Sequence, residues 1–120
     1  MSNGLDYVAT NLVMRSVLLE ESGATVSRNG NDVPTAGFYV GGVVESLVFD
    51  SRDKIDFPSV REFLGRADTP FVGFWLDTET GKIYFDLVDW YRSVRDALHL
   101  AKVRGELAVW DVACEAEIRL

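Results

Sequence analysis

Two alternating apolar runs around a glycine-containing turn constrain the fold of this chain more than any other feature. The first run is Phe71–Leu76, the second starts at Ile83, and Gly81 lies in the turn between them. Glycine adopts positive φ angles without steric strain, as a type I turn followed by a bulge requires. Because side chains alternate along a strand, each run presents one apolar face. These two faces comprise Val72, Phe74, Leu76, Ile83, Phe85 and Leu87. The pattern predicts a β-hairpin that seeds a hydrophobic core.

Two segments before the hairpin have the apolar spacing of amphipathic helices. Residues 5–21 are predicted to form the first helix, which Gly23 ends. Because this segment contains several β-branched residues, a strand is the alternative. A second, short helix is predicted to start at Ser59, because Ser59 and Glu62 match a capping box, and to stop at Gly65. Residues 50–57 are predicted to form a charged loop before it.

A third helix is predicted over residues 94–104, after the hairpin. Ser93 and Asp96 resemble a capping box at its start, and Gly105 follows its end. Asp89 is an alternative cap, which would draw Trp90 into the helix. The expected apolar face consists of Val94, Ala97, Leu98 and Ala101.

The remaining apolar segments predict strands at both ends of the chain. They comprise residues 24–27, residues 37–49 with a bulge or bend at Gly41–Gly42, residues 107–112, and a last short strand that includes Ile118 and Leu120. The sum predicts one α+β domain over residues 1–120. We expect two layers: a mostly antiparallel sheet of about five strands, with two to three helices packed on one face.

Composition and charge remove several function classes. The formal net charge is −7, and the charges are spread along the chain, so phosphate neutralisation by a basic patch, and with it direct nucleic-acid binding, is not expected. One Cys and one His allow no intrachain disulfide and no Cys/His zinc set, so no metal or cofactor is expected. A catalytic pair of Cys114 and His99 lacks any supporting motif, and a buried thiol with a surface imidazole is the favoured interpretation. With no signal peptide and no apolar run long enough to span a membrane, the protein is expected to be cytoplasmic.

A row of cations on the third predicted helix is one candidate site. Steps of three, four and three residues place these side chains on the face opposite the apolar residues. The row consists of Arg92, Arg95, His99 and Lys102. On an acidic protein, such a row could bind a phosphate, a nucleotide or an acidic partner. A solvated outer face explains the same spacing and is the favoured interpretation.

An aromatic set is a second candidate site, and consists of Trp75, Tyr84, Trp90 and Trp110. Trp75 lies on the strand face opposite Phe74, and Tyr84 on the face opposite Phe85. If helices cover only one face of the sheet, these rings form an interface or ligand platform on the other. Ordinary rim packing, or a sheet covered on both sides, explains the same pattern and is the favoured interpretation.

A set of carboxylates is a third candidate, since paired carboxylates can transfer protons or hold a metal. The set consists of Asp77, Glu79, Asp86, Asp89 and Asp111. No spacing among them stands out, and several fall at turns or strand ends. We therefore expect no catalysis from them.

Several short motifs resemble those of small, mostly uncharacterised proteins encoded by actinobacterial phages and related mobile elements. The motifs comprise residues 73–77 (Gly-Phe-Trp-Leu-Asp), 80–86 (Thr-Gly-Lys-Ile-Tyr-Phe-Asp), 96–98, 107–111, 23–26 and 37–40. The resemblance covers most of the chain after residue 20, and its motifs are mainly structural. It carries over no catalytic residues, and it implies a small accessory protein that works inside a bacterial host.

Taken together, these features predict a non-enzymatic accessory protein that acts by binding another protein. The partner is expected to be either a second copy, giving a homodimer, or a bacterial host protein. A nucleotide-sequestering protein that uses the cationic row is the alternative. A further alternative is an acidic DNA mimic that inhibits a host defence protein.

Overall fold

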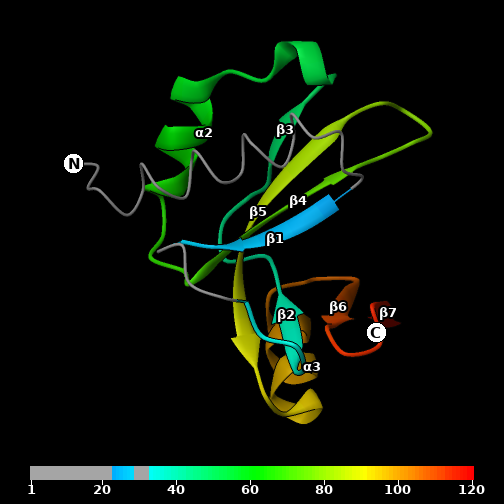
Figure 1. The fold of residues 1–120 in the computed structure, drawn as a ribbon. Helices are drawn as coiled ribbons and strands as arrows, with labels where there is room; N and C mark the ends of the chain where they lie inside the picture. Colours follow the sequence, from blue (N-terminus) through cyan, green and yellow to red (C-terminus); the bar gives the residue numbers. More distant parts are fainter. Residues whose placement is uncertain (1–22, 29–32) are drawn as a thin grey trace.

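The computed structural model describes residues 23–28 and 33–120, and these residues form an α+β fold (Figure 1). Seven antiparallel strands form one sheet, which has more strands than the five or so predicted. Residues 37–49 form two strands rather than one, and the last short strand predicted around Ile118 is present at residues 116–119. The elements are β1 (Gly23–Ser27), β2 (Phe38–Val40), β3 (Leu47–Phe49), the 3-10 helix η1 (Arg52–Lys54), α2 (Phe57–Leu64), β4 (Phe71–Leu76), β5 (Ile83–Tyr91), α3 (Val94–Val103), β6 (Ala108–Asp111) and β7 (Ala116–Arg119). The helix predicted over residues 5–21 lies outside the described residues.

Strand β5 is the longest strand, and the sheet is arranged along it. On one edge it pairs with β4, from Leu76 opposite Ile83 to Phe71 opposite Val88. On the other edge it pairs with β3 through residues 83–85 and with β2 through residues 89–91. Residues 41–46 leave this second edge opposite residues 86–88, so the bend predicted at Gly41–Gly42 is confirmed.

Helices α2 and α3 lie over opposite ends of β5 and cover two separate cores (Figure 1). The core under α2 consists of Phe49, Val60, Phe63, Leu64, Val72, Phe74, Ile83, Phe85 and Leu87. The smaller core under α3 consists of Val40, Ala97, Ala101 and Val109, with Tyr91 packed against it. The residues of β5 that belong to these two cores have odd numbers and share one face of the strand, while the even-numbered Val88 is buried on the other face. We call the sheet face that carries the even-numbered residues of β5 the outer face.

The hairpin and α3 follow the local signals in the sequence. Gly81 has φ +79°, and the amide of Asp77 donates to the carbonyl of Lys82 over 2.9 Å. Ser93 caps α3 by accepting from the amide of Asp96 at 3.4 Å. The alternative cap at Asp89 is wrong, because β5 remains extended through residue 91. On α3, the small buried residues Ala97 and Ala101 belong to the core, whereas Val94, the first residue of the helix, is 40% exposed.

Helix α2 begins earlier than predicted. Asp56 is the N-cap, and its carboxylate accepts from the amide of Ser59 at 2.7 Å. A carboxylate caps a helix as well as a hydroxyl does, and it also suits the positive end of the helix dipole. Pro58 sits in the first turn, where no amide donor is needed. The predicted stop is confirmed, since Gly65 is the C-cap.

A buried arginine fixes the C-terminal end of α2 to the sheet. Arg28 directly follows β1 and is only 7% exposed. Its guanidinium donates to the carbonyls of Leu64 at 2.6 Å, Thr69 at 2.6 Å and Ala67 at 2.7 Å. The carbonyl of Leu64 lies at the end of the helix and has no partner within it, and those of Ala67 and Thr69 lie in the segment that follows. Arg28 therefore satisfies carbonyls of the helix end and of this segment.

Candidate functional site: the outer face of the sheet

Three residues on neighbouring strands form a cross-strand row on the outer face. Val48 of β3 lies opposite Tyr84 of β5, and Tyr84 lies opposite Trp75 of β4. Val48 is 42% exposed and Trp75 is 46% exposed, whereas their chain neighbours Phe49 and Phe74 are buried in the core. We call Val48, Tyr84 and Trp75 the Trp75 row. None of the three residues belongs to either core, so the row is an apolar surface outside the cores.

The two aromatic rings of the row stack on each other. The centroids of Trp75 and Tyr84 are 4.4 Å apart and the ring planes differ by 8°. A pair of this kind contributes about 0.5–1.5 kcal/mol and fixes the orientation of both rings. The next cross-strand neighbour of Trp75 is Gly23, which has no side chain to cover the indole. The row is therefore a rigid surface with an exposed Trp, which is typical of a contact region.

The other two aromatic candidates lie on the same face but at the opposite end of the sheet. Trp90 is half-buried, and its indole Nε1 donates to the carbonyl of Ala36 at 2.7 Å. A Cβ on Gly37 would overlap this indole, so residues 36–37 pack directly against it. Trp110 lies opposite Tyr39 and is 41% exposed. Trp90 thus already serves the packing of the chain, and only Trp110 offers a comparable exposed ring.

Three residues of the cationic row lie on α3, whereas Arg92 precedes Ser93, the N-cap of this helix. Arg92, Arg95, His99 and Lys102 are all exposed, whereas Ala97 and Ala101 on the opposite side are buried. The predicted helical spacing therefore holds for Arg95, His99 and Lys102 but not for Arg92. Exposed cations are also typical of a solvated helix face, so their exposure does not by itself indicate a binding site.

Two of the predicted carboxylates lie where β2 and β3 separate, together with two residues that the sequence pattern did not single out. Asp89 forms an ion pair with Arg104, with 2.7 Å between Oδ2 and Nη2, and Arg104 also donates to the carbonyl of Gly41 at 3.1 Å. Glu106 lies over the glycine pair, because a Cβ on Gly42 would come within 2.9 Å of its Cδ. Asp86 accepts a hydrogen bond from the hydroxyl of Ser46.

Burial and mutual repulsion perturb two of these carboxyl groups. Desolvation raises the pKa of Asp86, and the hydrogen bond from Ser46 only partly opposes this. Desolvation also raises the pKa of Glu106, the charge of Asp86 raises it further, and Arg104 lowers it. Asp86 and Glu106 therefore take up protons at a higher pH than an ordinary Asp or Glu does. The other carboxylates stand apart: Asp77 accepts from the amide of Glu79 in the hairpin turn, and Asp111 from the amide of Cys114.

The expected burial of Cys114 is wrong. Strand β6 ends at Asp111, and the carboxylate of Asp111 accepts from the amide of Cys114 at 3.2 Å in the turn that follows. The thiol is exposed, and its hydrogen bond to Asp111 and the negative charge of that residue raise its pKa. A raised pKa keeps the sulfur as the weakly nucleophilic thiol. His99, as expected, is at the surface.

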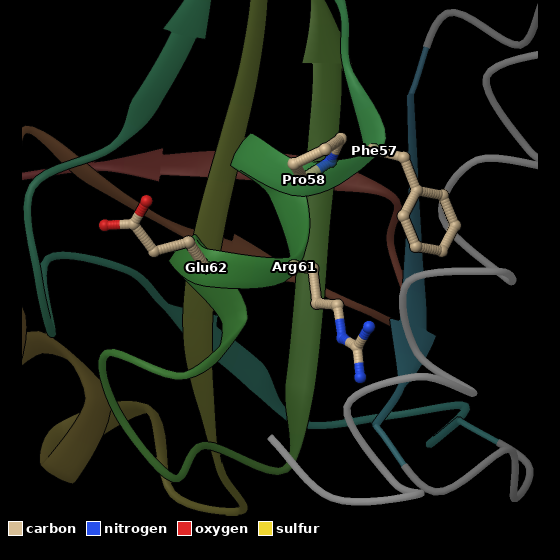
Figure 2. A pocket seen from close by; sticks show the side chains of 4 residues that line it. All are labelled: Phe57, Pro58, Arg61 and Glu62. Carbon is tan, nitrogen blue, oxygen red and sulfur yellow. The ribbon is translucent and has the colours of Figure 1, made fainter. Parts of the chain in front are cut away.

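One described pocket lies beside the first turns of α2 (Figure 2). It has a volume of about 410 Å³ and is lined by Phe57, Pro58, Arg61 and Glu62. In Figure 2, Phe57 and Arg61 project from one side of the helix and Glu62 from the other. The pocket contains none of the candidate residues predicted from the sequence.

No protein-family model, curated protein or solved structure matches this chain. Across residues 23–28 and 33–120, no three His, Cys, Asp or Glu side chains are arranged to hold a metal ion. In the same part of the chain, neither α-helix has the length and apolar character that crossing a membrane requires. Function is therefore inferred from the geometry of the chain's own residues.

Proposed function

We propose that this protein is a small, non-enzymatic accessory protein that binds another protein through the Trp75 row. The observation that carries the proposal is the stacked pair of the exposed Trp75 and the half-buried Tyr84, beside the exposed Val48 on the outer face of the sheet. Exposed aromatic residues held rigidly on a sheet lose little conformational entropy on binding, which makes them effective anchors. The resemblance to actinobacterial phage proteins supports an accessory role inside a bacterial cell.

The charge around the row indicates the chemistry of the partner. The segments that flank the row, residues 45–54 and 77–82, carry five acidic side chains against three basic ones. The chain as a whole has a formal net charge of −7. Interfaces combine an apolar centre with a rim of complementary charge. The partner that fits best is a protein segment with apolar side chains and flanking lysines or arginines, and arginine can also stack on the indole.

Selection of peptide ligands tests this function even though the partner is unidentified. A random peptide library is selected on the wild-type protein, and the binders are then measured on Trp75→Ala and Tyr84→Ala. We expect basic, aromatic-rich or aliphatic-rich peptides that lose at least tenfold in affinity on either variant, since central aromatic contacts contribute about 2 kcal/mol or more.

Trp110→Ala is the matched control, because Trp110 has similar exposure on the same sheet face but lies at its other end. The proposal requires that Trp110→Ala leaves the affinity unchanged. It fails if the library yields no binders, or if the binders tolerate both substitutions in the row. Binders that lose affinity on Arg95→Glu and Lys102→Glu instead would favour the cationic row of α3.

A further inference from the structure

Strand β7 leaves one edge of the sheet open for pairing. Among the strands that the structure describes, β7 is the last in the sheet order and pairs with β6 alone (Figure 1). Its residues Ala116, Glu117 and Arg119 are exposed, and Ile118 is half-buried against the core under α3. An exposed edge carries unsatisfied backbone groups that can pair with another strand.

The register with β6 determines which backbone groups point outward. The amide of Leu120 donates to the carbonyl of Leu107 at 3.0 Å. In an antiparallel pair, hydrogen-bonded residues alternate along the strand, so the backbone groups of Ile118 also point to β6. The amides and carbonyls of Glu117 and Arg119 therefore point away from β6, toward the open edge.

The sequence of this edge is complementary to itself. If β7 pairs antiparallel with β7 of a second copy around Ile118, then Glu117 of each copy lies opposite Arg119 of the other. Centring the pair on Glu117 or on Arg119 would place like charges opposite each other, which is unfavourable. Within one copy the two side chains form an exposed ion pair over 3.5 Å, and such a pair exchanges partners at little cost. Charged residues often protect an edge strand from pairing, but here their opposite signs on one face select one register instead.

Exposed leucines beside β7 provide apolar surface for the same contact. Leu107 is 74% exposed and Leu120 is 53% exposed, and the hydrogen bond between them places them side by side. Both continue the face that carries Ile118. In the pairing centred on Ile118, Leu120 lies opposite Ala116 of the second copy. The contact would therefore remove apolar side chains from water as well as pair backbone groups.

We propose that the protein forms a homodimer by antiparallel pairing of β7, with Ile118 at the two-fold axis and Glu117 opposite Arg119 of the second copy. This contact is separate from the Trp75 row, which lies on β3, β5 and β4. It therefore goes beyond the proposed function and does not depend on it.

Sedimentation equilibrium on charge variants tests the dimer. We expect wild type to be a dimer, and Arg119→Glu to raise the dimer dissociation constant about tenfold or more, because two attractive pairs become repulsive. Glu117→Arg should weaken the dimer similarly. The double variant Glu117→Arg/Arg119→Glu restores both opposite-charge pairs and should restore the dimer. Arg95→Glu makes the same change in charge on α3 and should leave the dimer intact.

Each failure has a distinct meaning for the two proposals. A monomeric wild type would overturn the β7 dimer, and so would a dimer that Arg119→Glu leaves unchanged or a double variant that does not regain it. A dimer that dissociates in Trp75→Ala but not in Arg119→Glu would move the self-contact to the Trp75 row. That result would overturn the β7 pairing and would still support binding through the row.

Discussion

At the scale of single residues, Arg28 links strand β1 to the end of helix α2 with one side chain. We predict that Arg28→Met lowers the free energy of unfolding by about 3 kcal/mol, because hydrogen bonds from a charged donor to buried carbonyls are lost. Arg66→Met is the control: Arg66 is exposed near the same helix end, and its ion pair with Glu62 spans 3.8 Å. Loss of an exposed pair should change stability by less than about 0.5 kcal/mol. Urea denaturation measures both, and equal effects would contradict the role assigned to Arg28.

Asp86 links stability to pH. Because burial raises its pKa in the folded state, the folded protein binds this proton more tightly than the unfolded chain does. The stabilisation from the neutral carboxyl is therefore present at low pH and is lost as pH rises through the folded pKa. Glu106 acts in the same direction.

We therefore predict that Asp86→Asn, which resembles the neutral carboxyl, is more stable than wild type at pH 7.5 and that this gain shrinks near pH 4. Urea denaturation at the two pH values measures the difference. Asp50→Asn, at an exposed carboxylate, is the control for removal of one negative charge. A gain of the same size at both pH values would show that Asp86 carries its charge in the folded state without penalty.

At the scale of elements, the close packing of Trp90 of β5 against Gly37 connects the strand to the segment before β2. Gly37→Ala should lower the free energy of unfolding by more than about 2 kcal/mol, because its φ of +89° disfavours alanine and the new Cβ would overlap the indole. Gly81→Ala has the same backbone strain at φ +79° but meets no atom within 4 Å, so it should cost about 1 kcal/mol. Thermal unfolding measures the loss of stability in both variants, and the difference between the two losses is the cost of the overlap between the new Cβ and the Trp90 indole. Equal losses would mean that the indole moves aside without penalty.

The elements that the sequence predicts well are those with local signals. The hairpin around Gly81 and the start of α3 at Ser93 depend on residues a few positions apart, and the structure confirms both. The start of α2 differs from the prediction because Asp56 and Ser59 are both competent caps, and only packing of the helix decides between them.

Contacts between distant parts of the chain explain most of what the sequence did not show. Arg28 bonds to carbonyls 36 to 41 positions away, and Arg104 reaches Gly41 across 63. No periodic pattern encodes such pairs. The alternation of the strands did place Trp75 and Tyr84 on one face, but it could not show that the indole of Trp90 donates to the carbonyl of Ala36.

At the scale of the whole molecule, the two proposed contacts use different parts of the sheet. A dimer through β7 would carry two Trp75 rows and could bind a surface that displays its partner twice. We predict that Arg119→Glu lowers the apparent affinity for densely immobilised peptide at least tenfold but leaves the affinity for free peptide unchanged. Surface binding and calorimetry measure the two affinities. If Arg119→Glu also weakens binding of the free peptide, the two surfaces are not independent.

The most direct test of the central proposal is a map of the binding surface by nuclear magnetic resonance. The ¹⁵N-labelled protein is titrated with the strongest selected peptide, with the indole signal of Trp75 assigned through Trp75→Phe. We predict the largest shift changes at that indole and at the amides of Val48 and Tyr84, with no more than minor changes along residues 92–102. Changes concentrated on residues 92–102, with the Trp75 indole unmoved, would contradict binding through the Trp75 row and would assign the contact to the cationic face of α3.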